Sequence, residues 1–250
     1  MDPWYQIPLL FVVGLAAGTL NVLAGGGSFL TLPVLIFIGL PPGIANATNR
    51  VAIFLQNVGA VWSFKRFGVL DSKSLLWAAV PATLGAIPGA WLALAIPDRA
   101  FQKLLAVLMV AVTLWTLWSS RGEADDTQRP ENRPSYLTLG AGFFVAGAYG
   151  GFVQAGVGFL VLAVTTAAGL DLVRGNAVKV LTILALTAVS LAIFVWQGRV
   201  DWPIGLSLAS GTVVGGVLGS RLTVQRGHKW LQRVVTITIL IFAVKLWLAP

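Results

Sequence analysis

Residues 24–33 read AGGGSFLTLP, and they place three consecutive glycines inside a stretch that is otherwise apolar. Glycine costs a helix interior about 1 kcal/mol relative to alanine, so three in a row are a strong local reason for a helix to end. Gly25, Gly26 and Gly27 therefore predict an interruption. We expect one helix to end before them and a short second helix to start near Ser28.

The composition predicts a membrane protein. Of the 250 residues, 57% are hydrophobic and 10% are charged, whereas a soluble domain carries about 25% charged residues. Apolar runs of about 20 residues, which are long enough to cross the hydrocarbon core of a bilayer, recur along the chain. We therefore expect an all-α, polytopic helical protein embedded in the lipid bilayer.

Charge and cysteine usage exclude several other classes. The net charge is +8, but Lys and Arg lie mostly at the ends of apolar segments, as membrane topology favours, so we do not expect nucleic acid as a partner. The absence of cysteine excludes a disulfide framework and a thiolate metal site. An intramembrane enzyme would need a nucleophile with a base, and Ser28 has no intramembrane histidine partner. We therefore expect no catalytic residue, metal ion or cofactor.

Two similar halves make up the chain. We expect a first repeat over residues 1–120, a linker over 121–135 and a second repeat over 136–250. Apolar segments are expected at about 4–24, 28–40, 44–64, 74–96 and 100–119, and again at about 136–155, 158–170, 174–196, 203–222 and 230–249. A shift of 130 residues without gaps pairs Gly26 with Gly156, Asn46 with Asn176, Phe64 with Phe194, Gly85 with Gly215, and Gly89 with Gly219. These pairs indicate a duplication, and the last two, spaced G-xxx-G, predict close helix packing.

The charges in the loops predict that the two repeats are inverted. If each half crosses the membrane an odd number of times, about 12 Lys and Arg residues lie on one side and about 4 on the other; an even number gives about 8 and 8. The positive-inside rule favours the first arrangement. We therefore expect a cytoplasmic linker and both termini outside. The short segments 28–40 and 158–170 are left open as re-entrant or crossing.

Glycine interruptions at membrane depth favour an anion-binding site. Irregular backbone is tolerated there only where it is buried in protein or lines a polar cavity. A short helix that starts in such a cavity directs unpaired N–H groups and about half a positive charge into it. The second half has a comparable stretch, GGFVQAGVGF, at residues 150–159. The candidate binding residues at the two breaks are Gly25, Gly26, Gly27, Ser28 and Asn21 in the first half, and Gln154, Gly156 and Gly158 in the second.

Basic side chains also occur within apolar segments. The stretches ANATNR (45–50) and GNAVKV (175–180) each open an apolar helix with polar residues. Those we predict at the site are Asn46, Asn49, Arg50, Asn176 and Lys179. A cation in the membrane interior costs from about 3 to well over 10 kcal/mol, so two interpretations stand: the basic side chains snorkel to the interface, or they face a binding site. No Asp or Glu lies inside an apolar segment, which leaves positive charge for a negatively charged substrate to balance.

Residues 14–52 and 142–162 resemble the sulfite exporter TauE/SafE family, also described as toluene sulfonate uptake permeases. The resembling features are the glycine cluster, the Leu-Pro step that follows it, and GLPPGIANAT at 39–48. The second copy departs from the first, because Ala163 stands where the first copy has Pro33. The resemblance implies transport of small sulfur-containing anions, such as sulfite or organosulfonates, across a bacterial inner membrane.

Together these features predict a secondary transporter, with export favoured, that binds a small oxyanion near the midplane between two broken-helix ends. Backbone N–H groups, Ser28 and the asparagines would donate hydrogen bonds, and Arg50 and Lys179 would supply positive potential. The alternatives are a facilitative anion channel, an uptake permease for another small organic anion, and a cation transporter, although the last would need interior carboxylates. The oligomeric state stays open, a homodimer included.

Overall fold

The computed structural model describes residues 5–69, 72–119 and 136–225, and within these ranges it contains nine α-helices and no strand. They are α1 (Gln6–Ala24), α2 (Ser28–Phe37), α3 (Pro42–Arg66), α4 (Ser72–Ala95), α5 (Asp98–Ser119), α6 (Tyr136–Phe152), α7 (Val157–Ala167), α8 (Leu172–Trp196) and α9 (Trp202–Gln225). Helices α1, α4, α8 and α9 are long and apolar enough to cross a membrane. The all-α prediction is confirmed for the described residues, while the predicted linker 121–135 and segment 230–249 lie outside them.

The first glycine cluster separates α1 from α2. Gly25 has a φ of 89°, in the left-handed region, and its N–H group donates to carbonyl oxygens of the last turn of α1. Glycine adopts this conformation without a steric penalty, which is why it so often ends a helix. Helix α2 then starts at Ser28. In the second half, α6 ends at Phe152, and Gly156, with a φ of 75°, precedes α7.

Corresponding helices of the two halves have matching bounds. Helix α8 begins and ends 130 residues after α3, and α9 begins and ends 130 residues after α4. The turns match as well, because Gly39 and Gly68 have positive φ angles, as do Gly169 and Gly198. The local structure therefore repeats where the sequence repeats.

Helices α3 and α8 lie against each other and run in opposite directions. Arg50, in the first half of α3, contacts Ser190 and Phe194 near the end of α8. At the other end, Phe64 of α3 belongs to the same hydrophobic cluster as Ala177 near the start of α8. The two corresponding helices are thus antiparallel neighbours.

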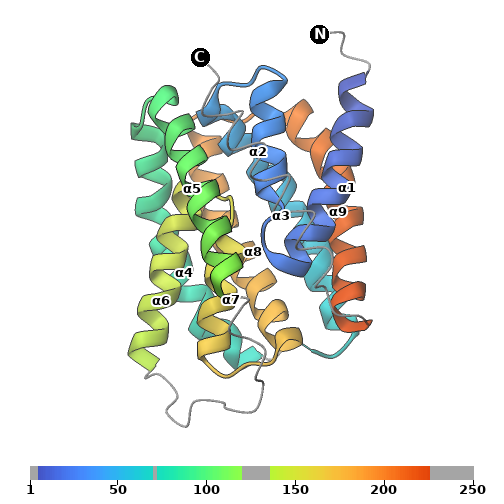
Figure 1. Ribbon diagram of the computed structural model, residues 1–250, viewed down its shortest axis with the longest axis vertical. Helices are drawn as coiled ribbons and strands as arrows, with labels where there is room; N and C mark the ends of the chain where they lie inside the picture. The colour runs from blue at the N-terminus through green and yellow to red at the C-terminus, as the bar shows by residue number, and fades with distance from the viewer. Residues whose placement is uncertain (1–4, 70–71, 120–135, 226–250) are drawn as a thin grey trace.

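The first helix of each half packs along the fourth helix of the other half. Figure 1 shows α1 beside α9 and α6 beside α4. The predicted close packing of glycines is confirmed here: a Cβ on Gly215 would lie 2.2 Å from the carbonyl oxygen of Leu15, and one on Gly85 would lie 2.1 Å from that of Phe144. Because backbone touches backbone in both pairs, the two halves are interlocked.

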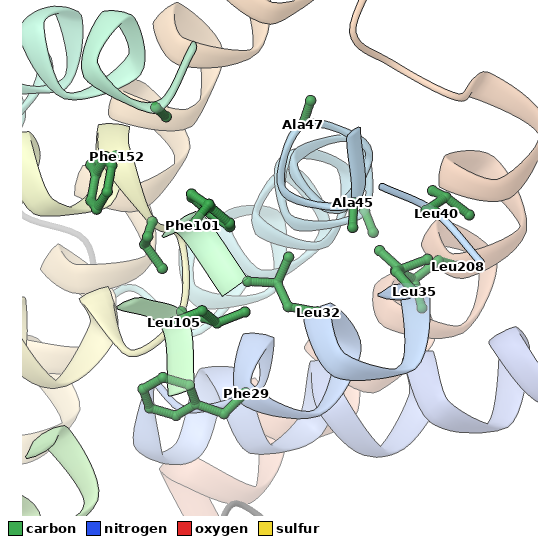
Figure 2. Packing of buried hydrophobic residues seen from close by; sticks show 14 of the residues in the cluster. Phe29, Leu32, Leu35, Leu40, Ala45, Ala47, Phe101, Leu105, Phe152 and Leu208 are labelled. Carbon is green, nitrogen blue, oxygen red and sulfur yellow. The ribbon is translucent and has the colours of Figure 1, made fainter. Parts of the chain in front are cut away.

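Apolar side chains enclose the short helix α2. Phe29, Leu32 and Leu35 recur every three residues, share one side of the helix and are buried. Figure 2 shows these side chains close to Phe101 of α5. The ring of Phe101 also meets Phe152 at the end of α6, with 5.9 Å between the ring centroids. Helix α5 therefore packs against elements from both breaks.

Candidate functional site

The two breaks contact each other. A Cβ on Gly158, at the start of α7, would lie 2.4 Å from the Cα of Gly25, and one on Gly25 would lie 2.7 Å from the Cα of Gly158. The ring of Phe159 covers Gly26 and stacks on Phe29, with 6.5 Å between the ring centroids. The breaks therefore form one region in which only glycine permits the approach of the two backbones.

Arg50 of α3 lies against the end of α6. Its side chain is fully buried, and its guanidinium donates to the carbonyl oxygens of Gly150 at 2.9 Å and Gly151 at 2.6 Å. The same group donates to Gln154 Oε1 at 2.7 Å and to Ser190 Oγ at 2.8 Å. The last carbonyl groups of a helix lack partners and carry partial negative charge, so a cation there is stabilised.

Lys179 of α8 binds the end of α1 in the same way. Its Nζ donates to the carbonyl oxygens of Val22 at 2.7 Å and Asn21 at 3.2 Å, and to Asn176 Oδ1 at 2.6 Å. This side chain is also fully buried. Arg50 belongs to the first half and Lys179 to the second, so each half supplies the cation that holds the broken helix of the other.

These positions decide between the two interpretations of the interior cations. Neither Arg50 nor Lys179 snorkels, because both side chains are buried against backbone carbonyls. Each cation meets its break at the carbonyl end of the preceding helix. A break creates two ends of opposite partial charge, and a cation is attracted to the carbonyl end. The N–H end of each following helix stays separate from the cation.

Several backbone N–H groups at the breaks have no acceptor. In the described part of the chain, the buried residues concerned are Gly26, Gly27, Gln154, Ala155 and Gly156. Buried backbone N–H groups without a partner are rare in native proteins. They occur here at the starts of two helices, where the helix dipole favours negative charge. The region can therefore donate several hydrogen bonds to an anion.

The predicted asparagines of α3 connect this helix to both breaks. Asn46 Nδ2 donates to the carbonyl oxygen of Phe152 at 3.0 Å, and Asn49 Oδ1 accepts from Thr31 Oγ1 at 2.6 Å. Asn46 Oδ1, Asn49 Nδ2 and Arg50 Nε are buried and have no hydrogen-bond partner in the described structure. Unpaired buried polar atoms cost free energy, so their clustering indicates a place where a ligand or water binds.

Two residues predicted at the first break take different roles. Ser28 begins α2 and is buried, as expected for a residue at a helix N-terminus. Asn21 binds Lys179 through its backbone carbonyl, so the hydrogen bond does not use its side-chain amide. The structure places all the predicted residues at the breaks or on the parts of α3 and α8 that face them.

Sequence analysis missed the residues of α8 that complete the Arg50 site. Thr187 Oγ1 accepts from Gln154 Nε2 at 2.9 Å, Ser190 accepts from the guanidinium, and the ring centroid of Phe194 lies 4.8 Å from Arg50 Cζ. Thr187, Ser190 and Phe194 are three and four residues apart, a spacing that places them on one face of a helix. Two hydroxyl residues with this spacing in an apolar helix were a signal available in the sequence.

The sequence profile described as "Sulfite exporter TauE/SafE" matches residues 10–246. The chain belongs to the sulfite exporter TauE/SafE family. Relatives of this TauE/SafE chain include the probable membrane transporter protein ORF9 of Sinorhizobium sp, 28% identical over 249 residues that cover 99% of this chain and 94% of the relative. A probable membrane transporter protein of Haemophilus influenzae is 29% identical, covering 96% and 94%, and the probable membrane transporter protein YfcA of Escherichia coli K12 is 28% identical, covering 95% and 88%. No solved structure matches the chain significantly.

Membership in the TauE/SafE family establishes the general class of activity. The family and the named relatives are membrane transporters, and four described helices are long and apolar enough to cross a membrane. The buried polar region of this TauE/SafE chain therefore lies inside a membrane transporter.

Proposed function

We propose that the protein is a secondary transporter that exports small sulfur-containing anions, such as sulfite or organosulfonates, across a bacterial inner membrane. In this proposal the oxyanion binds between the two breaks. The observation that carries it is the unequal satisfaction of the breaks: their carbonyl ends bind Arg50 and Lys179, while N–H groups on the other side have no acceptor. Helix N-termini favour anions, and the family description supports sulfite as the substrate.

Electrostatics support an anion over a cation as the substrate. The starts of α2 and α7 each contribute about half a positive charge. Arg50 and Lys179 each add one charge, of which a helix C-terminus offsets about half. No Asp or Glu is buried among the described residues, so the protein itself does not balance this charge. A bound oxyanion would balance it through charge-assisted hydrogen bonds.

In this proposal the two halves are inverted repeats, with the linker in the cytoplasm and both termini outside. Support comes from the antiparallel contact of α3 with α8 and from the exchange of first helices between the halves. In Figure 1, α1 starts at the top of the view and α6 at the bottom, so the two broken-helix hairpins enter from opposite ends. Rocking of one half against the other would then expose the site alternately to the two sides.

Flux in proteoliposomes tests the proposed function. The purified protein is reconstituted, and efflux of radiolabelled sulfite is compared with that from protein-free liposomes. Unlabelled organosulfonate, acetate and potassium are added in turn as competitors. We expect efflux above the protein-free rate and strong competition by the organosulfonate. Acetate should compete less, because a carboxylate offers two oxygen acceptors to the N–H groups where a sulfonate offers three. Efflux equal to the protein-free rate would contradict the proposal.

Charge-matched variants test the site. Arg50→Lys and Lys179→Arg keep the charge, whereas Arg50→Gln and Lys179→Gln remove it and keep a hydrogen-bond donor. We expect the neutral variants to bind sulfite at least about tenfold more weakly, since a hydrogen bond to a charged group contributes about 1.5–3 kcal/mol. Thermal unfolding in detergent without anion separates a lost site from a lost fold. Equal affinities in all four folded variants would place the two cations outside the site.

A further inference from the structure

A pocket of about 250 Å³ lies beside the Arg50 site, at the end of the molecule where α4 is followed by α5. It is lined by residues 93–98, by Gly43 at the start of α3, and by Phe194 and Arg199 at the end of α8. Sites for drug-sized ligands occupy about 300–1,000 Å³. This smaller volume suits a small anion that keeps part of its hydration shell.

Phe194 separates this pocket from Arg50. Its side chain lines the pocket, and its ring centroid lies 4.8 Å from Arg50 Cζ. Phe194 is 2% exposed, so the ring closes the pocket at this side. A guanidinium over an aromatic face is held by cation–π attraction. An anion that reached Arg50 from the pocket would have to replace this contact.

Arg199 makes the mouth of the pocket electropositive. Gly198 is left-handed, with a φ of 64°, and the N–H group of Arg199 donates to the carbonyl oxygen of Phe194 at 3.0 Å, the bond pattern that commonly ends a helix. Asp98 is also in the pocket, but its Oδ1 accepts from the N–H group of Gly43 at 2.8 Å. Its charge is thus used at the start of α3, while the exposed Arg199 attracts anions from solution.

We propose that this pocket is the vestibule of the anion path and that Phe194 is its gate, which swings off Arg50 when an anion enters. The inference rests on the proposed function. The other half has an equivalent residue, Phe64, whose carbonyl oxygen accepts from the N–H group of Val69 at 3.3 Å, in the same helix-ending pattern. Phe64 is fully buried in a cluster with Val22 and Val180. The described structure is therefore open toward Phe194 and packed around Phe64.

The absence of native cysteine permits a direct test, because a single introduced cysteine has no background. Ile96 lines the pocket, whereas Ser190 is fully buried and bonds Arg50 on the far side of Phe194. Ile96→Cys and Ser190→Cys proteins in nanodiscs, with both faces accessible, are treated with the anionic reagent 2-sulfonatoethyl methanethiosulfonate, and labelling is followed by mass spectrometry. We expect fast labelling at 96 and slow labelling at 190. Adding Phe194→Ala should accelerate labelling at 190 by about tenfold, because the ring and its cation–π contact are gone.

Phe64→Ala is the matched control, because it removes the same side chain from the equivalent position of the other half. Combined with Ser190→Cys it should leave labelling unchanged. No acceleration by Phe194→Ala, or equal acceleration by Phe64→Ala, would overturn the gate. Thermal unfolding verifies each fold, and Phe194→Leu replaces the alanine variant if the latter unfolds. Labelling needs no flux, so absent sulfite efflux in the unsubstituted protein would contradict the proposed function, while the labelling ratio still decides the gate.

Discussion

Arg50 and Lys179 are buried without an acidic partner, and backbone carbonyls take the place of the missing carboxylates. Burial of a cation is expensive unless its hydrogen bonds are satisfied in good geometry. The planar guanidinium of Arg50 reaches two carbonyls, an amide and a hydroxyl at once, while the compact ammonium of Lys179 meets two carbonyls and Asn176. Each cation therefore stabilises the end of a helix whose following N–H groups stay available.

Gly158→Ala should destabilise the protein, because its Cβ would lie 2.4 Å from the backbone of Gly25. Backbone cannot move aside as a flexible side chain can, and overpacking costs about 1–3 kcal/mol. We expect a lower Tm in detergent and loss of sulfite efflux. Gly140→Ala in α6 is the control: nothing lies within 4 Å of the added Cβ, and the helix should gain up to about 1 kcal/mol. An unchanged Tm for Gly158→Ala would contradict the contact between the breaks.

Helices α1 and α6 are held by their partners α9 and α4 through glycine contacts on both sides of the molecule. The same kind of contact occurs twice, with Gly215 against the carbonyl oxygen of Leu15 and Gly85 against that of Phe144. In a bilayer such contacts depend on van der Waals packing, since lipid removes the hydrophobic driving force between helices. Small residues are therefore required wherever a broken helix has to be held firmly along its length.

Gly215→Ala and Gly85→Ala should lower stability by similar amounts, because each places a Cβ within 2.2 Å of a carbonyl oxygen across an equivalent interface. We expect losses of about 1–3 kcal/mol for each. Val214→Ala is the control, because Val214 precedes Gly215 in α9 but is 44% exposed, and its loss should change stability by no more than about 0.5 kcal/mol. Unfolding in detergent measures all three. A large effect of Gly215→Ala alone would show that the two interfaces are not equivalent.

The molecule as a whole concentrates positive charge in its interior. Two helix starts, Arg50 and Lys179 contribute to it, and no Asp or Glu is buried among the described residues. A buried carboxylate that could carry a proton alongside the substrate is thus missing from the described part of the chain. An anion that crosses alone carries its charge through the membrane, so the membrane potential drives it from the negative to the positive side.

A monovalent organosulfonate should distribute across liposomes according to the membrane potential. At 100 mV, one elementary charge is worth about 2.3 kcal/mol, or about 50-fold in concentration ratio. We expect enrichment approaching this ratio on the positive side when valinomycin and a potassium gradient set the potential. Protein-free liposomes are the control, and labelled substrate on each side gives the ratio. A ratio near one in the presence of the protein would indicate electroneutral exchange.

Much of the fold could be predicted because its causes are local. Apolar length predicts helices in a bilayer, and three consecutive glycines end one, so α1 and α2 appear on either side of residues 25–27. The pairing of Asn46 with Asn176 and of Phe64 with Phe194 foretold equal bounds for α3 and α8. The candidate residues could be chosen for a similar reason, since polar groups in apolar helices are rare and costly.

The partners of those residues could not be predicted. Lys179 contacts a carbonyl 157 positions away in the chain, and Arg50 one 101 positions away. Both cations turned toward the carbonyl ends of α1 and α6, where prediction had directed them to an anion. Thr187 and Ser190 were missed because a hydroxyl in an apolar helix often bonds its own backbone, and only the proximity of Gln154 and Arg50 gives these two a further role.

By itself, then, the sequence determined an all-helical membrane protein with a duplicated pattern, two interrupted helices and interior cations without interior anions. These properties follow from hydrophobic length, glycine and composition, which act within a few turns of helix. Only the tertiary structure decided that the breaks touch, that each half caps the other, and that Phe194 stands between a pocket and Arg50. The reason is physical: dipole ends and buried charges select their partners by distance in space, and that distance is set only when the helices pack.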